Sequence, residues 1–114
     1  MSNNDIMTHS AAIEWAPAMV PVLADRALEA ERLRRLPEET IADFDAADVW
    51  RLVVPERLGG HGHGLRTMTA VAEALAHGCT STAWTTSFLI MHNWFVLRSG
   101  AALQEELFAT RPWV

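Results

Sequence analysis

The chain has 114 residues, of which 50% are hydrophobic and 20% are charged, the balance of one ordinary globular domain with a real core. Its formal net charge is −5 and all nine basic residues are arginines, so the basic footprint of a nucleic-acid-binding protein is absent. A single cysteine excludes an internal disulfide, and no signal peptide or membrane-spanning run is recognisable. We therefore expect a cytoplasmic protein without a nucleic-acid or membrane partner.

The N-terminal third predicts a polar end followed by a long helical segment. Residues 1–10 are polar, and we expect them to be disordered, which leaves residues 11–114 as the folded domain. Apolar residues recur at helical spacing between residues 11 and 36. Because Pro17 and Pro21 lie within this segment, the helix either begins near Pro21 or is kinked.

A second helix is predicted to start at Pro37, because proline suits the first helical position and the acids that follow face the positive end of the helix dipole. Its inward face would consist of Ile41, Phe44 and Ala47. A short apolar stretch, residues 49–54, follows and ends at Pro55.

Residues 59–64 read Gly-Gly-His-Gly-His-Gly and form the one conspicuous loop of the sequence. A flexible turn between helices explains the glycines by their tolerance of positive φ. A phosphate-facing loop is a second interpretation, although no strand precedes the loop and the lysine of a P-loop is missing. Coordination of a metal by His61 and His63 is a third, but no further ligands are nearby in the sequence.

Two more helices on either side of a central one complete the prediction. Residues 66–78 are amphipathic, with Gly78 as a C-cap, and the last helix lies within residues 100–109. In the helix of residues 66–78, the inward residues would be Met68, Val71, Ala72, Leu75 and Ala76, and the outward residues would be Thr67, Glu73 and His77. The last helix would make its contacts through Leu103, Leu107 and Phe108. With no alternating pattern typical of strands, we predict an all-α domain of about five helices.

The central helix begins after Cys79 with three hydroxyl residues, which favour a helix N-terminus. It is apolar almost all round, so we expect it to be buried. At ~100° per residue one stripe is selectively polar and aromatic. This stripe contains Ser81, Thr85, Phe88 and His92, with Trp84 and Phe95 on its shoulder, whereas Ile90, Trp94 and Leu97 lie on the far side.

Little in this helix points to catalysis. No carboxylate pair and no nucleophile–base pair have suitable spacing, so we predict neither a catalytic residue nor a metal site. Cys79 is either a thiol of lowered pKa at a helix start or a small buried core residue. His92 is either a buried, hydrogen-bonded histidine or a ligand contact, and the aromatic residues are either core or a ligand wall. The residues alone predict a helical domain with a candidate ligand-facing helix.

Four segments resemble the N-terminal helical domain of the acyl-CoA dehydrogenase superfamily: residues 36–40, 52–60, 79–84 and 92–94. The second contains the Val-Pro-x-x-x-Gly-Gly element shared across that superfamily. Ser-Thr-Ala-Trp at residues 81–84, followed by His-Asn-Trp at 92–94, is more particular. It resembles the oxygenases of two-component, reduced-flavin-dependent monooxygenases, such as hydroxyphenylacetate hydroxylases and steroid-ring phenol hydroxylases.

The resemblance implies an enzyme that takes reduced FMN or FADH2 from a separate flavin reductase and uses O2 to hydroxylate a small aromatic molecule. In such enzymes the flavin lies between this domain, a β-domain and a C-terminal helical bundle, and the protein is a homo-oligomer, typically a tetramer. By the same resemblance, Trp84 and Ser81 would contact the flavin, and His92 and Phe88 would face the substrate.

Members of this family run to several hundred residues, so we expect this chain to be a fragment that is inactive alone, with an exposed face that causes self-association or marginal stability. Two alternatives are the N-terminal domain of an acyl-CoA dehydrogenase, whose catalytic glutamate would lie beyond residue 114, and a stand-alone, non-catalytic helical binding or assembly module.

Overall fold

A computed structural model of the protein describes residues 6–110. This part contains α1 (His9–Leu33), α2 (Glu38–Ala47), two short 3-10 helices, η1 (Val49–Arg51) and η2 (Glu56–Leu58), and then α3 (Leu65–Ala76), α4 (Thr80–Val96) and α5 (Ala101–Leu107). It contains no strand, so the predicted all-α class and the five α-helices are confirmed for the described residues. No helix in residues 6–110 is long and apolar enough to cross a membrane.

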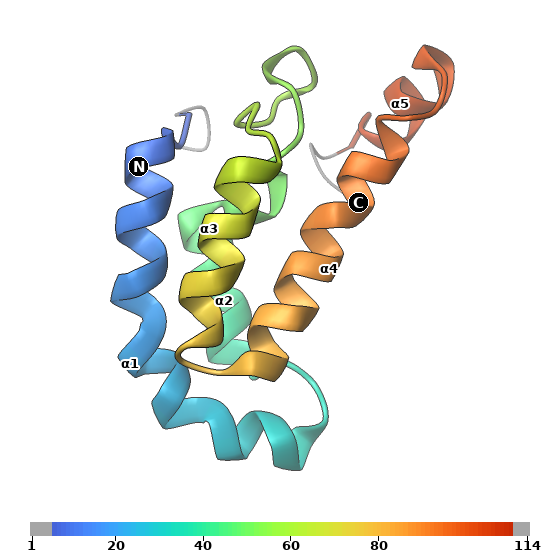
Figure 1. Ribbon diagram of the computed structural model, residues 1–114. Helices are drawn as coiled ribbons and strands as arrows, with labels where there is room; N and C mark the ends of the chain where they lie inside the picture. The colour runs from blue at the N-terminus through green and yellow to red at the C-terminus, as the bar shows by residue number, and fades with distance from the viewer. Residues whose placement is uncertain (1–5, 111–114) are drawn as a thin grey trace.

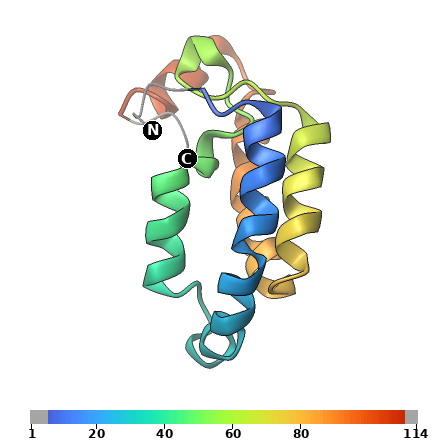
Figure 2. The ribbon, with the colours of Figure 1, turned by 90° about the vertical axis from the view of Figure 1, so that its left-hand side faces the viewer.

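The long helices pack as a layer with α3 between α1 and α4, and α2 lies behind this layer (Figure 1). Figure 2 shows the same arrangement from the side, with α2 across from α3. Three aromatic rings join the elements at the centre: Phe44 of α2 lies 5.2 Å from Trp15 of α1 and 5.7 Å from Trp50 of η1, measured between ring centroids. Phe44 is fully buried, so this ring cluster is the middle of the core.

Helix α1 runs without interruption through Pro17 and Pro21, so the prediction that a helix begins near Pro21 is wrong and the kinked helix is the correct alternative. Its ribbon changes direction in its lower, C-terminal part (Figure 1). The Thr8 hydroxyl caps the helix by accepting the N–H of Ala11 at 3.0 Å. The helix thus begins at His9, inside the segment predicted to be disordered; residues 1–5 lie outside the described part of the chain.

The predicted buried and exposed residues are partly wrong in three helices. In each helix a polar residue is buried because it has a hydrogen-bond partner far away in the sequence. In α2, which begins at Glu38 rather than Pro37, Ile41 is 37% exposed, whereas Thr40 is fully buried and accepts a hydrogen bond from Arg26 at 3.2 Å. In α5, Leu103 and Leu107 are exposed and the buried residues are Gln104 and the following Phe108. In α3, Thr67 is buried rather than exposed.

Glycines permit close approach or a positive φ at two places, the α3–α4 turn and the loop of residues 59–64. Gly78 follows the α3 C-cap, which is His77 rather than Gly78 as predicted, and a Cβ on Gly78 would lie 2.7 Å from the Val20 carbonyl oxygen of α1. The loop of residues 59–64 is a turn, as predicted: Gly59 and Gly62 have φ values of 92° and 75°. The loop folds back on residues 51–54 through three backbone hydrogen bonds, including Gly62 N–H to Val54 O at 2.8 Å.

Candidate functional site

Helix α4 has one buried side and one exposed side, so the prediction of a helix buried all round is wrong. The buried residues are Thr82, Ala83, Thr86, Ile90 and Asn93. Asn93 fixes the helix to the core by donating from its side-chain amide to the Trp50 carbonyl oxygen at 3.1 Å. The opposite side is the stripe that the helical spacing predicted, and it is open: Trp84 is 64% exposed, Phe88 49% and Phe95 57%.

Trp84, Phe88 and His92 lie one helical turn apart and form a continuous row, which we call the aromatic ladder. The rings of Trp84 and Phe88 are stacked, with centroids 5.0 Å apart and planes inclined by 11°. The His92 ring meets Phe88 edge-on at 4.5 Å. An exposed aromatic row of this kind offers apolar contact area to the ring of a planar ligand.

The tautomer of His92 follows from its hydrogen bond. Its Nδ1 lies 2.7 Å from the Phe88 carbonyl oxygen. A carbonyl oxygen only accepts, so Nδ1 carries the proton, and in the neutral ring Nε2 is left as an acceptor. Within residues 6–110 this Nε2 has no hydrogen-bond partner, and His92 is exposed. The ring can therefore accept a hydrogen bond from a hydroxyl group of a ligand.

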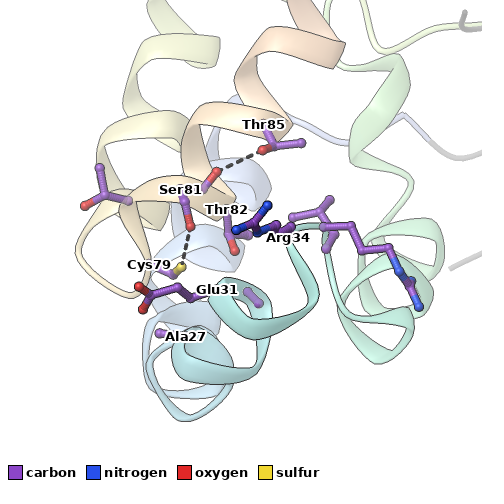
Figure 3. A pocket seen from close by; sticks show the side chains of 11 residues that line it. Ala27, Glu31, Arg34, Cys79, Ser81, Thr82 and Thr85 are labelled. Carbon is purple, nitrogen blue, oxygen red and sulfur yellow. Dashed lines mark hydrogen bonds between the residues drawn. The ribbon is translucent and has the colours of Figure 1, made fainter.

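Ser81 lies further down the same face, at the mouth of a cavity of about 610 Å³ between the C-terminal end of α1 and the start of α4 (Figure 3). The Thr85 hydroxyl donates to the backbone carbonyl oxygen of Ser81 at 3.0 Å, and the Ser81 hydroxyl separately forms a hydrogen bond with the Cys79 thiol at 3.4 Å. The cavity is lined by Ala27, Ala30, Glu31, Arg34, Arg35, Leu36, Cys79, Thr80, Ser81, Thr82 and Thr85.

Cys79 is both a buried residue and a thiol of lowered pKa, the two alternatives given for it from the sequence. The side chain is buried, with 8% exposed. Burial raises the pKa of the Cys79 thiol, but hydrogen bonds from Ser81 and Thr82 lower it by more, so the pKa lies below its usual value. Cys79 is thus a small buried residue whose thiol is also moderately acidic.

Sequence reasoning found the ladder but missed the charged side chains beside it. Glu31 and Arg34 reach the cavity from the C-terminal end of α1, about fifty residues before α4 in the chain. No local pattern could have paired them with α4. Among the described residues there is also no group of three or more histidine, cysteine, aspartate or glutamate side chains that could hold a metal ion.

The fold and this site define an all-α domain that exposes an aromatic helix face. Residues 8–111 match the family described as "Acyl-CoA dehydrogenase, N-terminal domain". The chain belongs to this family, and the resemblance predicted from residues 36–40, 52–60, 79–84 and 92–94 is confirmed.

Similar proteins include oxygenase components of flavin-dependent monooxygenases. The flavin-dependent monooxygenase, oxygenase subunit HsaA, of Rhodococcus jostii is 31% identical over 80% of this chain and 24% of its own length. The pigment production hydroxylase of a Rhodococcus species is 31% identical over 94% of this chain and 28% of its own length. The oxygenase component of p-hydroxyphenylacetate 3-hydroxylase of Acinetobacter baumannii is 30% identical over 88% of this chain and 24% of its own length. The chain thus spans roughly a quarter of these relatives. No solved structure matches it significantly.

Proposed function

We propose that this chain is the N-terminal helical domain of the oxygenase component of a two-component flavin-dependent monooxygenase that hydroxylates a small aromatic substrate. The observation that carries the proposal is the exposed aromatic ladder on α4, which ends in a histidine whose Nε2 is an unoccupied acceptor. The names of the similar proteins support the same class of reaction. Reduced flavin, when bound, supplies the activation of O2 for this chemistry.

The ladder divides into a cofactor end and a substrate end. We assign Trp84 and Ser81 to the flavin, because the exposed indole offers a flat apolar surface of the kind an isoalloxazine stacks on, and the hydroxyl offers a polar contact beside it. We assign Phe88 and His92 to the substrate. The Phe88 ring can pack on an aromatic ring, and Nε2 of His92 accepts the hydrogen bond of a phenolic hydroxyl. An apolar wall also keeps water away from the reacting groups.

The partners follow from the reaction class. A separate flavin reductase would supply the reduced cofactor, either reduced FMN or FADH2, and the remaining three quarters of an oxygenase of this kind would cover the open side of α4. Phe95 also lies on this side, and Leu89 is 41% exposed, so the apolar area is larger than the ladder alone. We expect the complete oxygenase to be a homo-oligomer in the cytoplasm.

The experiment is an anaerobic titration of the chain with reduced FMN and with FADH2, followed by tryptophan fluorescence. We expect weak, saturable quenching that is lost in Trp84→Phe. The matched control is Trp94→Phe, because Trp94 lies on the same helix away from the ladder, half-buried and in contact with Arg98. Quenching that persists in Trp84→Phe and disappears in Trp94→Phe would overturn the flavin assignment. Absence of quenching in every variant would count against a flavin role for this domain.

The family description alone would also accommodate the N-terminal domain of an acyl-CoA dehydrogenase. The two functions differ in the ligand that His92 meets, a phenol or a thioester-linked acyl chain. A phenol adds a hydroxyl hydrogen that Nε2 can accept, whereas a saturated acyl chain does not. A His92→Phe variant should therefore weaken phenol binding and leave an acyl-chain ligand unaffected or more tightly bound.

A further inference from the structure

The two histidines of the 59–64 loop hold the backbone of one residue near the N-terminus. The N–H of Met7 donates to Nδ1 of His61 at 2.7 Å, and Nε2 of His63 lies 2.5 Å from the Met7 carbonyl oxygen. These partners are 54 and 56 residues away in the chain. The Met7 side chain is 4% exposed, so the residue is held by its backbone and packed by its side chain. The loop and the start of α1 lie at the same end of the molecule (Figure 1).

The contacts of His61 require a neutral ring. Because a backbone N–H only donates, Nδ1 must be unprotonated, and Nε2–H then donates to the Asp48 carbonyl oxygen at 2.8 Å. The His61 side chain is fully buried. Burial lowers the pKa of His61, the hydrogen bond with Asp48 raises it, and the charge of Arg51 lowers it, leaving the pKa below its usual value.

A second set of hydrogen bonds orients the His63 ring. Since Nε2 of His63 donates to Met7, its Nδ1 is an acceptor, and it faces the Thr67 hydroxyl at 3.5 Å. The same hydroxyl lies 2.7 Å from Nδ1 of His9 on α1. Thr67 can therefore accept from His9 and donate to His63, which explains why it is buried in α3 although the helical pattern placed it outside.

We propose that His61 and His63 form a proton-operated clasp, which holds Met7 when His61 is neutral and releases it when His61 is protonated. The proton comes from solvent and binds Nδ1, the atom that accepts the Met7 N–H. Donor then faces donor and the hydrogen bond of the Met7 N–H is lost, so that only the contact of His63 with the carbonyl oxygen still holds the Met7 backbone and the amide opens to solvent.

Charged groups on neighbouring residues act on the His61 ring when it is protonated. The Asp48 carboxylate lies 3.6 Å from Nε2 and is itself paired with Arg51, which also donates to the Gly59 carbonyl oxygen. The carboxylate attracts a protonated ring, whereas the Arg51 charge and a protonated His63 repel it. The Arg51 charge acts on the ring more strongly than the paired Asp48 carboxylate, so the surrounding charges disfavour a protonated ring in this position.

The test follows the Met7 amide by NMR in the intact chain between pH 7.5 and pH 5, as a hydrogen-exchange protection factor corrected for intrinsic exchange. As the pH falls below the ordinary histidine pKa of about 6.5 toward the lower folded pKa of His61, we expect protection to fall by up to about tenfold for each pH unit, because the released state binds the proton more tightly than the clasped state. Ring nitrogen spectra should show His61 as the Nε2–H tautomer, titrating together with the loss of protection.

His61→Asn is the matched variant, because its side-chain oxygen can accept the Met7 N–H near the position of Nδ1 and does not titrate. We expect Met7 to stay protected across the whole pH range in this variant. His77→Asn, at an exposed histidine after α3, should titrate like the unmodified chain. If His61→Asn does not fold, the Met7 protection and the His61 tautomer measured in the unmodified chain still test the proposal. Protection of Met7 that is unchanged while the His61 ring titrates, or an Nδ1–H tautomer, overturns the clasp.

Discussion

Replacing Gly60 by alanine tests why the Gly-Gly pair follows Val-Pro in this sequence. An alanine Cβ would lie 2.0 Å from the Val54 carbonyl oxygen and 2.4 Å from the Val54 Cβ, whereas real Cβ contacts do not fall below 3.0 Å. Val54 is fully buried, and its carbonyl oxygen accepts the N–H of Gly62 at 2.8 Å, so it cannot move without breaking the turn. Overpacking costs about 1–3 kcal/mol and a lost hydrogen bond about 1 kcal/mol, which together lower the free energy of unfolding by about 2–4 kcal/mol.

The assay is urea denaturation followed by tryptophan fluorescence, with Gly64→Ala as the matched control in the same loop. A Cβ on Gly64 meets nothing within 4 Å, and its φ of −99° suits any residue. Both substitutions reduce the entropy of the unfolded chain in the same way, and Gly64→Ala adds only the small cost of alanine at the N-cap of α3, so the excess destabilisation of Gly60→Ala measures its steric cost. If Gly60→Ala and Gly64→Ala unfold within about 0.5 kcal/mol of each other, the reasoning is refuted.

Three further predictions concern stability, pH and reactivity. Phe44→Ala should lower the free energy of unfolding by about 3–5 kcal/mol in the same assay, because the ring is fully buried at the centre of the core. The free energy of unfolding should fall as the pH drops below about 6.5 toward the lower folded pKa of His61, because the unfolded chain binds that proton more tightly; His61→Asn should flatten this slope. Alkylation of Cys79, followed by mass spectrometry, should reach half its maximal rate at a lower pH than a free cysteine. Ser81→Ala should move that midpoint upward.

Helical periodicity predicted the elements well, because it depends only on which residues recur every three or four positions. It failed where burial depends on a partner from elsewhere in the chain. Ile41 and Thr40 are neighbours in α2, and Arg26 of α1 is the reason that the threonine is the buried one. The two prolines of α1 are a similar case. A kinked helix is stable there because α1 packs along α3, with Gly78 at the α3–α4 turn against the Val20 backbone, a contact that no local pattern contains.

For the candidate site, helical spacing predicts which residues share a face but not whether that face is exposed. That Trp84, Phe88 and His92 share one side of a helix follows from spacing, but an apolar stripe in a core and an apolar stripe open to a ligand have the same spacing. The likeness to known oxygenases directed attention to the ladder, and its exposure in this domain is a finding of the structure.

In the loop of residues 59–64, local sequence predicts the turn but not the partners of its histidines. Its glycines predicted a turn, and a turn is what forms, yet the same backbone freedom brings the rings of His61 and His63 onto the two polar groups of one distant residue. The glycines therefore explain the shape of the loop, whereas the histidines are explained by their partners outside the loop, Met7 above all. Substituting the glycines tests the turn, and titrating the histidines tests the clasp, so each explanation can fail without the other.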